Sequence, residues 1–507
     1  MFRKLLLVIA ALLLLPALLF AQDGKLRGKV TDRESGEALI GANVTVEGSN
    51  LGAASDVNGE YVILSVPAGD YTVKVTYIGY SPTTISNVRV NSNITTTQDF
   101  KLVSSAIQIQ AVVIVAERPM IQRNTTNTIR VSQQEDVQYI PFRGVQNIVA
   151  LSAGAVQQGG TLYVRGGRAG EVGYYVDGAN ATNPLFGSES YGAIREAIEE
   201  VQLQTGGFTA ELGGANSGIV RTTTRTGSSQ LKASIDYLTD DFAKPGQQFL
   251  KTSAFGYKNA VGTISGPILE GVRFFAAGQF NYWRDRQPMW LVPFTFEGLV
   301  DDGLVSADNK GKALPGPIDF RQNYLPNTWL QDVQGQGNLL FDLKQLVDAP
   351  VKIRINALYD VNTSINGGTW PGVVGNYFRN PDKMSRNETK TFSGGVKLTH
   401  VVSQTTFYEV SVSMQSRKFR QFDPVFEDNW MSYADSAANA NAGFMGVVNP
   451  WSNRYSSPLN MSIISKFQLS DPNAPINGYS KNSQSSISAS VDFTSQINSR
   501  WELKAGG

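Results

Sequence analysis

Few residues in this chain could carry out acid–base, nucleophilic or metal chemistry. His400 is the only histidine among the 507 residues, and there is no cysteine. A catalytic zinc ion normally needs two or three histidines, and a Ser-His-Asp triad needs one beside its nucleophile. His400 stands in an alternating apolar pattern with Val396 and Leu398, so we interpret it as a residue of a β-sheet wall. We therefore predict no catalytic residue, no metal site and no cofactor.

The segment Asp56-Val57-Asn58-Gly59 begins like a calcium-binding loop. It lacks the remaining ligands and the distal glutamate that such a loop requires. A hairpin turn explains the segment better, because Asn-Gly readily adopts the positive φ angles of a tight turn.

The charge balance excludes another class of function. The chain has 44 basic and 43 acidic residues, so it lacks the excess of positive charge that nucleic-acid binding needs. In an exported protein, the absence of cysteine also excludes a disulfide framework and a lipoprotein anchor.

The N-terminus predicts export. Arg3 and Lys4 precede an apolar run over residues 5–20, and Ala21 follows, as in a cleavable signal peptide over residues 1–21. The alternative is an uncleaved anchor, but the run is shorter than the ~20 residues that a spanning helix needs. No other stretch is long enough to cross a membrane as a helix, so a membrane-embedded part would have to be a barrel.

Residues 25–103 alternate apolar and polar side chains in short segments separated by turn residues. This pattern is typical of a small β-sandwich. The expected strands cover residues 26–31, 43–47, 59–65, 71–77 and 85–90.

From about residue 104 to residue 226 the sequence pattern differs from that of the first unit. An apolar stretch over residues 107–115 predicts a strand, and glycine-rich turns with short strands follow it. Helical patterns occur near the end of residues 132–147 and, as a short amphipathic helix, over residues 194–201. Together these features predict a small α+β domain. Its expected strands cover residues 161–165, 172–176, 202–205 and 218–224.

From residue 230 to the end the chain repeats a strand-like alternation, with one face suited to lipid and the other to water. We expect about nine strands, joined by links that are alternately short and long. A soluble sandwich has no reason to keep all its long loops at one end, whereas an outer-membrane barrel does. The strands are expected to start near residues 230, 253, 272, 330, 350, 390, 406, 484 and 500.

A string of motifs in the first unit closely resembles the carboxypeptidase regulatory-like domain. The resemblance implies a transthyretin-like sandwich over residues 25–103 and not a peptidase, and such domains often precede the plug of an outer-membrane receptor. The motifs are Gly28-Lys29-Val30, Ile40-Gly41-Ala42-Asn43-Val44, Asp56-Val57-Asn58-Gly59-Glu60-Tyr61, Val66-Pro67-Ala68-Gly69-Asp70-Tyr71 and Tyr77-Ile78-Gly79-Tyr80.

Four later motifs resemble, in order and spacing, the signatures of TonB-dependent receptor plugs. They are Leu162-Tyr163-Val164-Arg165-Gly166-Gly167, Tyr175-Val176-Asp177-Gly178, the run from Ile194 to Gln202, and the run from Glu211 to Val220. The resemblance implies a mainly β fold: the sandwich, a small α+β plug over residues 117–226, and a transmembrane antiparallel β-barrel from residue 230 to 507. Around residues 206–218 the chain looks closer to Oar-like receptors than to glycan importers paired with a surface lipoprotein.

The resemblance also suggests roles for individual plug residues. Glycines permit tight turns in a domain that must fit inside a barrel, and Asp177-Gly178 is most simply a turn. We expect Arg165 and Arg221 to form structural ion pairs, in preference to ligand contacts. The plug-signature residues are Arg165, Gly166, Asp177, Gly178, Gly213, Gly218 and Arg221.

In this family a short extended segment before the plug, the TonB box, adds as a strand to the energy-coupling protein TonB. Residues 107–116 hold the candidate: Ala111, Val112, Val113, Ile114 and Val115. The alternative interpretation is a linker strand of the preceding sandwich.

The implied function is energy-coupled uptake of a siderophore, cobalamin, peptide or oligosaccharide across the outer membrane. The implied partners are TonB with its ExbB/ExbD motor, outer-membrane lipid, an extracellular ligand and, as an option, a surface lipoprotein. The plug residues expected to face the ligand are Gln157, Gln158, Asn180, Asn183 and Tyr191. The rival hypotheses are a binding, adhesion or signalling receptor of the same fold, and a carboxypeptidase-like enzyme, which the single histidine disfavours.

About nine strands are too few to close a barrel around a plug of about 120 residues. We therefore expect the barrel to be incomplete in this chain and the natural protein to continue beyond Gly507.

Overall fold

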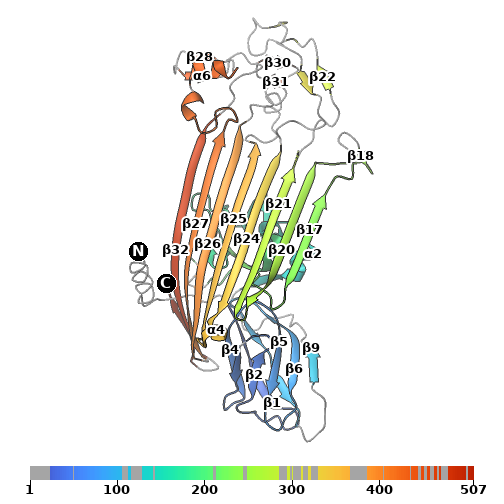
Figure 1. Cartoon of the computed structure of the whole chain (residues 1–507), viewed down its shortest axis with the longest axis vertical. Coiled ribbons are helices and arrows are strands. Elements are labelled where there is room, and N and C mark those ends of the chain that lie inside the picture. Colours follow the sequence, from blue (N-terminus) through green and yellow to red (C-terminus); the bar gives the residue numbers. More distant parts are fainter. Residues whose placement is uncertain are drawn as a thin grey trace.

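The computed structural model divides the chain into three stacked parts. A β-sandwich lies at one end of a tall, curved sheet, helix α6 (Ser436–Asn441) and strand β28 (Val447–Asn449) lie at the other end, and a smaller mixed domain lies behind the sheet (Figure 1). The structure describes residues 23–49, 51–104, 112–115, 128–140, 143–208, 213–243, 248–284, 294–296, 300, 310–311, 318–320, 329–365, 385–403, 405–433, 435–443, 447–449, 454–456, 462–464, 467–469, 478–497 and 501–507.

The sandwich consists of two sheets around one apolar core. In the first sheet β1 pairs with β4, β7 and β8, and the second has the order β3-β2-β5-β6-β9. The five predicted strands are confirmed, and four short ones add to them. The bounds are β1 (Gly24–Asp32), β2 (Asn43–Val46), β3 (Gly52–Ala54), β4 (Glu60–Val66), β5 (Gly69–Thr76), β6 (Thr83–Val90), β7 (Thr95–Thr97), β8 (Phe100–Leu102) and β9 (Val112–Val115).

The turn between β3 and β4 confirms the hairpin interpretation of the calcium-like segment. Asp56 Oδ1 accepts hydrogen bonds from the backbone N–H groups of Asn58 and Glu60, each at 2.8 Å. Gly59 has a φ of 74°, which glycine adopts without strain. The carboxylate therefore closes a turn.

The mixed domain, here called the plug, has a five-stranded sheet of order β10-β15-β16-β13-β14. Strands β13 and β16 are parallel, whereas β15 and β16 are antiparallel. The helical pattern of residues 132–147 appears as two short helices. The bounds are β10 (Ile129–Gln133), α2 (Gln134–Tyr139), α3 (Val145–Val149), β11 (Ala155–Gln158), β12 (Thr161–Val164), β13 (Val172–Val176), β14 (Ala179–Asn180), β15 (Ile198–Gln204) and β16 (Gly218–Thr224).

The expected helix over residues 194–201 is wrong. A single 3-10 turn, η1 (Arg195–Ala197), leads directly into strand β15. The spacing of Ile194, Ala197, Ile198 and Val201 imitates a helical face. However, β15 lies between β10 and β16, and nearly all its side chains are buried on both faces. Glu200 and Gln202, which suggested the solvent side of a helix, therefore lie on a buried face of a central strand.

The tall sheet contains nine antiparallel strands in sequential order, which confirms the predicted number. Short connections follow β20, β24, β26 and β32, and long ones follow β21, β25 and β27, as the sequence predicts. The strands are β17 (Lys232–Thr239), β20 (Tyr257–Leu269), β21 (Val272–Trp283), β24 (Leu330–Asp342), β25 (Val351–Ile365), β26 (Arg386–Ser403), β27 (Thr406–Phe422), β32 (Ser480–Gln496) and β33 (Glu502–Gly506).

The two faces of the sheet differ in chemistry. Ile355, Val396 and Val412 are neighbours across β25, β26 and β27 and lie on the outer face, each more than one third exposed. On the same strands Arg354 and Lys397 are register partners on the inner face, toward the plug. An apolar outer face and a polar inner face are what a membrane barrel wall requires.

His400 lies in β26, where its ring meets Tyr408 edge-on at 5.0 Å, as expected of a wall residue. Within the described part of the chain, no helix is both long and apolar enough to span a membrane. The same residues contain no group of three or more His, Asp or Glu side chains that could hold a metal ion.

Candidate functional site

The hairpin of β13 and β14 places one carboxylate of the plug against the sheet wall. Asp177 and Gly178 have φ angles of 49° and 87°, the two positive values that a tight two-residue hairpin turn needs. The turn interpretation of Asp177-Gly178 is therefore confirmed. The geometry directs the Asp177 side chain toward β16 and β25, where it is almost fully buried.

Asp177 joins the plug to the wall through several hydrogen bonds. Its Oδ1 accepts from Arg354 Nη2 at 2.8 Å and from the backbone N–H of Thr224 at 2.9 Å. Its Oδ2 accepts from the Thr224 hydroxyl and from Asn356 Nδ2 at 3.4 Å. A buried carboxylate is tolerated only when such partners replace its water. We call this group, Asp177 with Thr224, Arg354 and Asn356, the plug–wall tether.

Other lumen-facing side chains hold the plug at its backbone. Asn338 Nδ2 donates to Arg225 O at 2.7 Å, and Gln334 Nε2 donates to Gly192 O at 2.6 Å. The Ser393 hydroxyl donates to the Tyr191 hydroxyl at 2.7 Å. The plug is therefore fixed to β24, β25 and β26 by polar contacts that the inner face of a barrel can supply.

The sandwich contacts the lower rim of the same wall. Lys352 Nζ donates to Ser65 O at 3.2 Å, and the Ser65 hydroxyl donates to Asp23 Oδ2 at 2.7 Å. Burial alone would raise the pKa of Asp23, but Lys397 and Lys352 hold it below its usual value. Asp23 is thus a charged carboxylate at the junction of sandwich and wall.

The TonB-box candidate lies on the sandwich. Val112 to Val115 form β9, an edge strand that runs parallel to β6, with Val112 opposite Thr83 and Val115 opposite Ser86. Ala111 lies outside the described residues. A short edge strand presents one row of free backbone groups to a partner strand. This arrangement fits a segment for β-augmentation and also fits a linker strand of the sandwich.

The plug-signature residues lie in turns and in the plug sheet. Gly166 follows β12 with a φ of 72°, and Gly218 opens β16, where a Cβ would lie 2.8 Å from Val164 Cγ1. Gly213 is exposed, and Arg221 is buried in β16. Arg165 is exposed with a φ of 49°, and no ion pair joins it to an acidic residue of the described chain.

The residues expected to face the ligand divide into two groups. Gln158 and Asn180 are exposed and Gln157 is partly exposed, in β11 and β14. Asn183 and Tyr191 are buried. Asn183 Oδ1 accepts from the backbone of Leu185 and Phe186, and Tyr191 bonds to Ser393. Of these five residues, Gln157, Gln158 and Asn180 have exposed surface.

Sequence reasoning missed Arg354 and Arg89 as contacts of the plug. Arg354 lies in a strand of alternating apolar and polar residues, where a charged side chain indicates only the water-facing side of the sheet. The signal that could have found it is its position beside Asn356, since two lumen-facing polar groups that are two residues apart can meet one carboxylate.

Comparison with known proteins is consistent with this architecture. Residues 26–114 match the family model of the CarboxypepD_reg-like domain. The chain is 28% identical over 242 residues to the TonB-dependent transporter Oar of Myxococcus xanthus, a match that covers 45% of this chain and 23% of Oar. It is 36% identical over 110 residues to the TonB-dependent receptor SusC of Bacteroides thetaiotaomicron, covering 22% of this chain and 10% of SusC.

Similar solved structures include the FrpB iron transporter from Neisseria meningitidis, with a TM-score of 0.47 and 12% identity over 75% of this chain and 48% of FrpB. The siderophore receptor PiuA from Acinetobacter baumannii has a TM-score of 0.42 and 11% identity over 75% of this chain and 45% of PiuA.

Together the described residues form a mainly β fold: the sheets of the sandwich, a plug-like mixed sheet and a large antiparallel sheet. More particularly, its sequence resembles those of TonB-dependent receptors, Oar among them, and its N-terminal part matches the CarboxypepD_reg-like domain. The two curated relatives are named as a transporter and a receptor. The aligned part of the chain spans about a quarter of the length of Oar, as the 23% coverage shows.

Proposed function

We propose that the chain belongs to an energy-coupled importer that carries an unidentified ligand across the outer membrane into the periplasm. The observation that supports this proposal best is the plug–wall tether, because Asp177 and Arg354 fix a folded domain against the inner face of a barrel wall. In a closed barrel, a plug fixed in this way would block diffusion through the lumen, so transport would need work on the plug.

The proposal assigns each segment a place. Residues 1–21 direct export and are cleaved, residues 25–103 form a periplasmic sandwich, and residues 107–116 carry the TonB box. Residues 117–226 form the plug and residues 230–507 the first part of the barrel. TonB, driven by ExbB/ExbD, would pull on Ala111–Val115, while a siderophore, cobalamin, peptide or oligosaccharide binds outside, with or without a surface lipoprotein.

Binding of TonB tests the proposal directly. Replacing Ala111–Val115 by five Gly and Ser residues removes the apolar strand and keeps the chain length. We expect the full chain in detergent to lose at least ~tenfold in affinity for the periplasmic C-terminal domain of TonB, since strand addition depends on that segment. The same replacement at residues 122–126, in the same connection, is the matched control and should leave binding unchanged.

The competing candidate is a binding, adhesion or signalling receptor without transport, which the pairing of β9 with β6 would suit as a linker strand. Under that hypothesis the two replacement variants and the parent chain all bind TonB equally weakly. Cells that retain a labelled ferric siderophore or cyanocobalamin at the surface but show no protonophore-sensitive accumulation would also favour it.

A further inference from the structure

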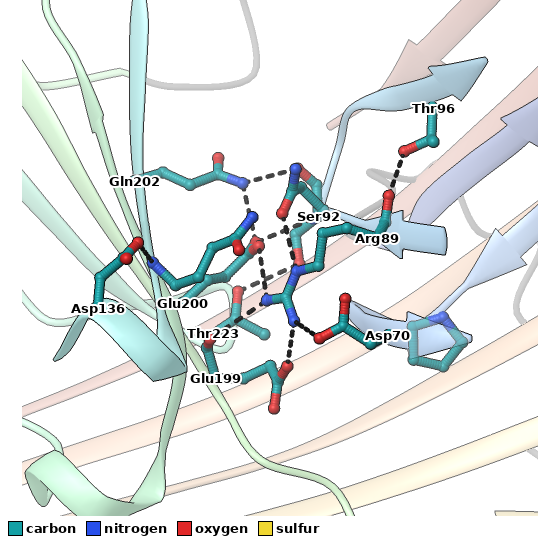
Figure 2. A network of polar contacts seen from close by, with 12 residues as sticks. Asp70, Arg89, Ser92, Thr96, Asp136, Glu199, Glu200, Gln202 and Thr223 are labelled. Carbon is teal, nitrogen blue, oxygen red and sulfur yellow. Dashed lines mark hydrogen bonds and ion pairs between the residues drawn. The ribbon is translucent and has the colours of Figure 1, made fainter. Parts of the chain in front are cut away.

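A cluster of charged side chains joins the sandwich to the plug (Figure 2). Arg89 of β6 donates from Nη1 to Glu199 Oε1 at 3.0 Å and to Asp70 Oδ2 at 3.2 Å. Its Nη2 lies 3.9 Å from Glu200 Oε2. Glu199 and Glu200 belong to β15 of the plug, and the Glu200 side chain is 0% exposed. One guanidinium therefore faces two carboxylates of another domain.

The backbone of β15 is shaped to make this contact. Successive residues of a strand normally point to opposite faces of the sheet. A register shift between Ile198 and Glu200 leaves Glu199 without a partner on β16. Such a bulge re-aims a side chain, so both Glu199 and Glu200 reach Arg89. The bulge thus directs the Glu199 carboxylate toward the sandwich.

The chain beyond Arg89 continues the contact with more polar groups. The Ser92 N–H donates to Glu200 Oε1 at 2.9 Å, and Gln202 Nε2 donates to Ser92 O at 2.9 Å. The hydroxyls of Ser92 and Thr223 lie 3.2 Å apart. Burial raises the pKa of Glu200, although the Ser92 N–H and Arg89 oppose the effect. The interface consists of hydrogen bonds and ion pairs.

This polar surface is incompletely satisfied. Glu200 Oε2 and Gln202 Oε1 are buried and have no hydrogen-bond partner among the described residues. Buried oxygens without donors lose the water that would solvate them, so separation returns part of the cost of burial. The apolar cores stay apart, because no sandwich residue belongs to the buried cluster of the plug. The contact is therefore of the kind that can open and close.

The sandwich is held differently on the barrel wall. Leu64 of β4 packs with Phe407 of β27 in a small apolar cluster. Arg273 Nη2 donates to Gly48 O at 2.9 Å, and Lys352 Nζ donates to Ser65 O at 3.2 Å. The sandwich is thus a support fixed to the wall, and the plug rests on it through Arg89.

We propose that Arg89, Glu199 and Glu200 form a releasable latch that holds the plug on the sandwich, so that the plug moves only after the latch opens. The contacts that define the latch are present in the structure whether or not the protein transports a ligand. Its link to energy coupling rests on the proposed function, since β9 pairs with β6, the strand that carries Arg89.

Disulfide trapping tests the latch in the purified full chain. The protein has no cysteine, so Ser92→Cys with Thr223→Cys creates one cross-link at a site where the two hydroxyls already lie 3.2 Å apart. We expect rapid cross-linking under mild oxidation in the parent background. Adding Arg89→Ala should slow it at least ~tenfold, because two carboxylates lose their cation, and Arg89→Lys should restore part of the rate.

Two controls make the outcome decisive. Arg143 links Glu196 of the plug to Asp236 of the wall at 3.3 and 3.1 Å, so Arg143→Ala removes a similar ion pair without touching the sandwich and should leave the rate unchanged. Lys74→Cys with Thr84→Cys joins partners within the sandwich and reports whether it remains folded. If Arg89→Ala disturbs this second cross-link, Glu199→Gln with Glu200→Gln replaces it from the plug side.

An unchanged Ser92–Thr223 cross-linking rate in folded variants that lack Arg89 or both carboxylate charges would overturn the latch. In cells, cross-linking should be at least ~twofold slower when the motor is energised than after a protonophore is added, because the opened population rises. A latch that passes the purified test but shows no protonophore effect would refute the energy coupling of the proposed function and leave the latch itself standing.

Discussion

Asp177 connects the plug to the wall through both its backbone conformation and its side chain. Its backbone closes the β13–β14 turn, while its carboxylate binds Arg354, Asn356 and Thr224. The turn and the tether reinforce each other, because the positive φ of 49° aims the side chain at the wall. A substitution that preserves the turn can therefore still release the plug.

We predict that Asp177→Ala destabilises the folded chain by about 3 kcal/mol, because it leaves the largely buried Arg354 guanidinium without its carboxylate. The measurement is urea unfolding of the full chain in detergent, with hydrogen exchange to locate the change in the plug. Asp241→Ala is the control. Its pair with Lys258 is about half exposed on both sides, so its loss should cost under about 1 kcal/mol.

Glu189 gives the plug a pH dependence. Burial raises the pKa of Glu189 from 4.5 to about 7, and a hydrogen bond with Gln146 opposes part of that shift. A raised pKa means that the folded state favours the protonated carboxyl. Its stabilising effect is complete below pH 4.5 and is lost as the pH rises through about 7.

Opening of residues 183–191 should consequently increase about tenfold or more between pH 5.5 and 8, in proportion to the pKa shift. Hydrogen exchange, corrected for the intrinsic effect of pH, measures it. In Glu189→Gln, which carries no titratable group at this position, the opening should be nearly independent of pH. A parent chain with equally flat behaviour would contradict the prediction.

At the scale of elements, two backbone segments of the sandwich pack closely enough to exclude a side chain between them. Strand β1 pairs with β4 on one side and with β7 and β8 on the other. The chain between β7 and β8 crosses directly over Gly28, where a Cβ would lie 1.8 Å from the carbonyl oxygen of Gln98. A glycine in the middle of a strand here allows two backbones to meet.

Gly28→Ala should therefore destabilise the sandwich by about 2–3 kcal/mol, because a backbone carbonyl must move to make room. Hydrogen exchange of residues 24–32 and 95–102 in the full chain should rise accordingly. Gly36→Ala serves as the control, since its φ is +74° but nothing lies within 4 Å. It should cost only about 1 kcal/mol of backbone strain. Equal effects would argue against packing as the cause.

For the whole molecule, the two faces of the wall differ in the surroundings they suit, and the outer face carries apolar side chains. Ile355, Val396 and Val412 form part of an apolar belt across three adjacent strands. The inner face turns charged and amide side chains toward the plug and the sandwich. The two faces of the wall therefore suit different environments. The effect of a substitution on assembly should depend on the face that the residue occupies.

Val396→Arg places a cation near the middle of β26 on the lipid side, where it should cost about 2–4 kcal/mol at the bilayer midplane. We expect a smaller fraction of the chain to assemble into a protease-resistant form in lipid vesicles. Val396→Leu keeps the apolar surface and should assemble like the parent. Normal assembly of the arginine variant would show that this face does not meet lipid.

The sequence by itself determined the features that are local. Alternation with a period of two predicted the strands of the sandwich and the nine wall strands, and turn residues such as Asp56–Gly59 and Asp177-Gly178 predicted their hairpins. These features depend on neighbours within a few residues, so a strand pattern or a positive φ can be inferred without knowing the rest of the chain.

Only the tertiary structure decided which faces meet. The pattern of residues 194–201 imitates a helix, yet residues 198–204 form a central strand, because β10 and β16 pair with its two edges. The contacts of Arg89 with Glu199 and of Arg354 with Asp177 join residues that are 110 and 177 positions apart. No local pattern encodes such pairs, because a charged residue on a strand is compatible with water, a carboxylate or another domain until the fold brings one of them near.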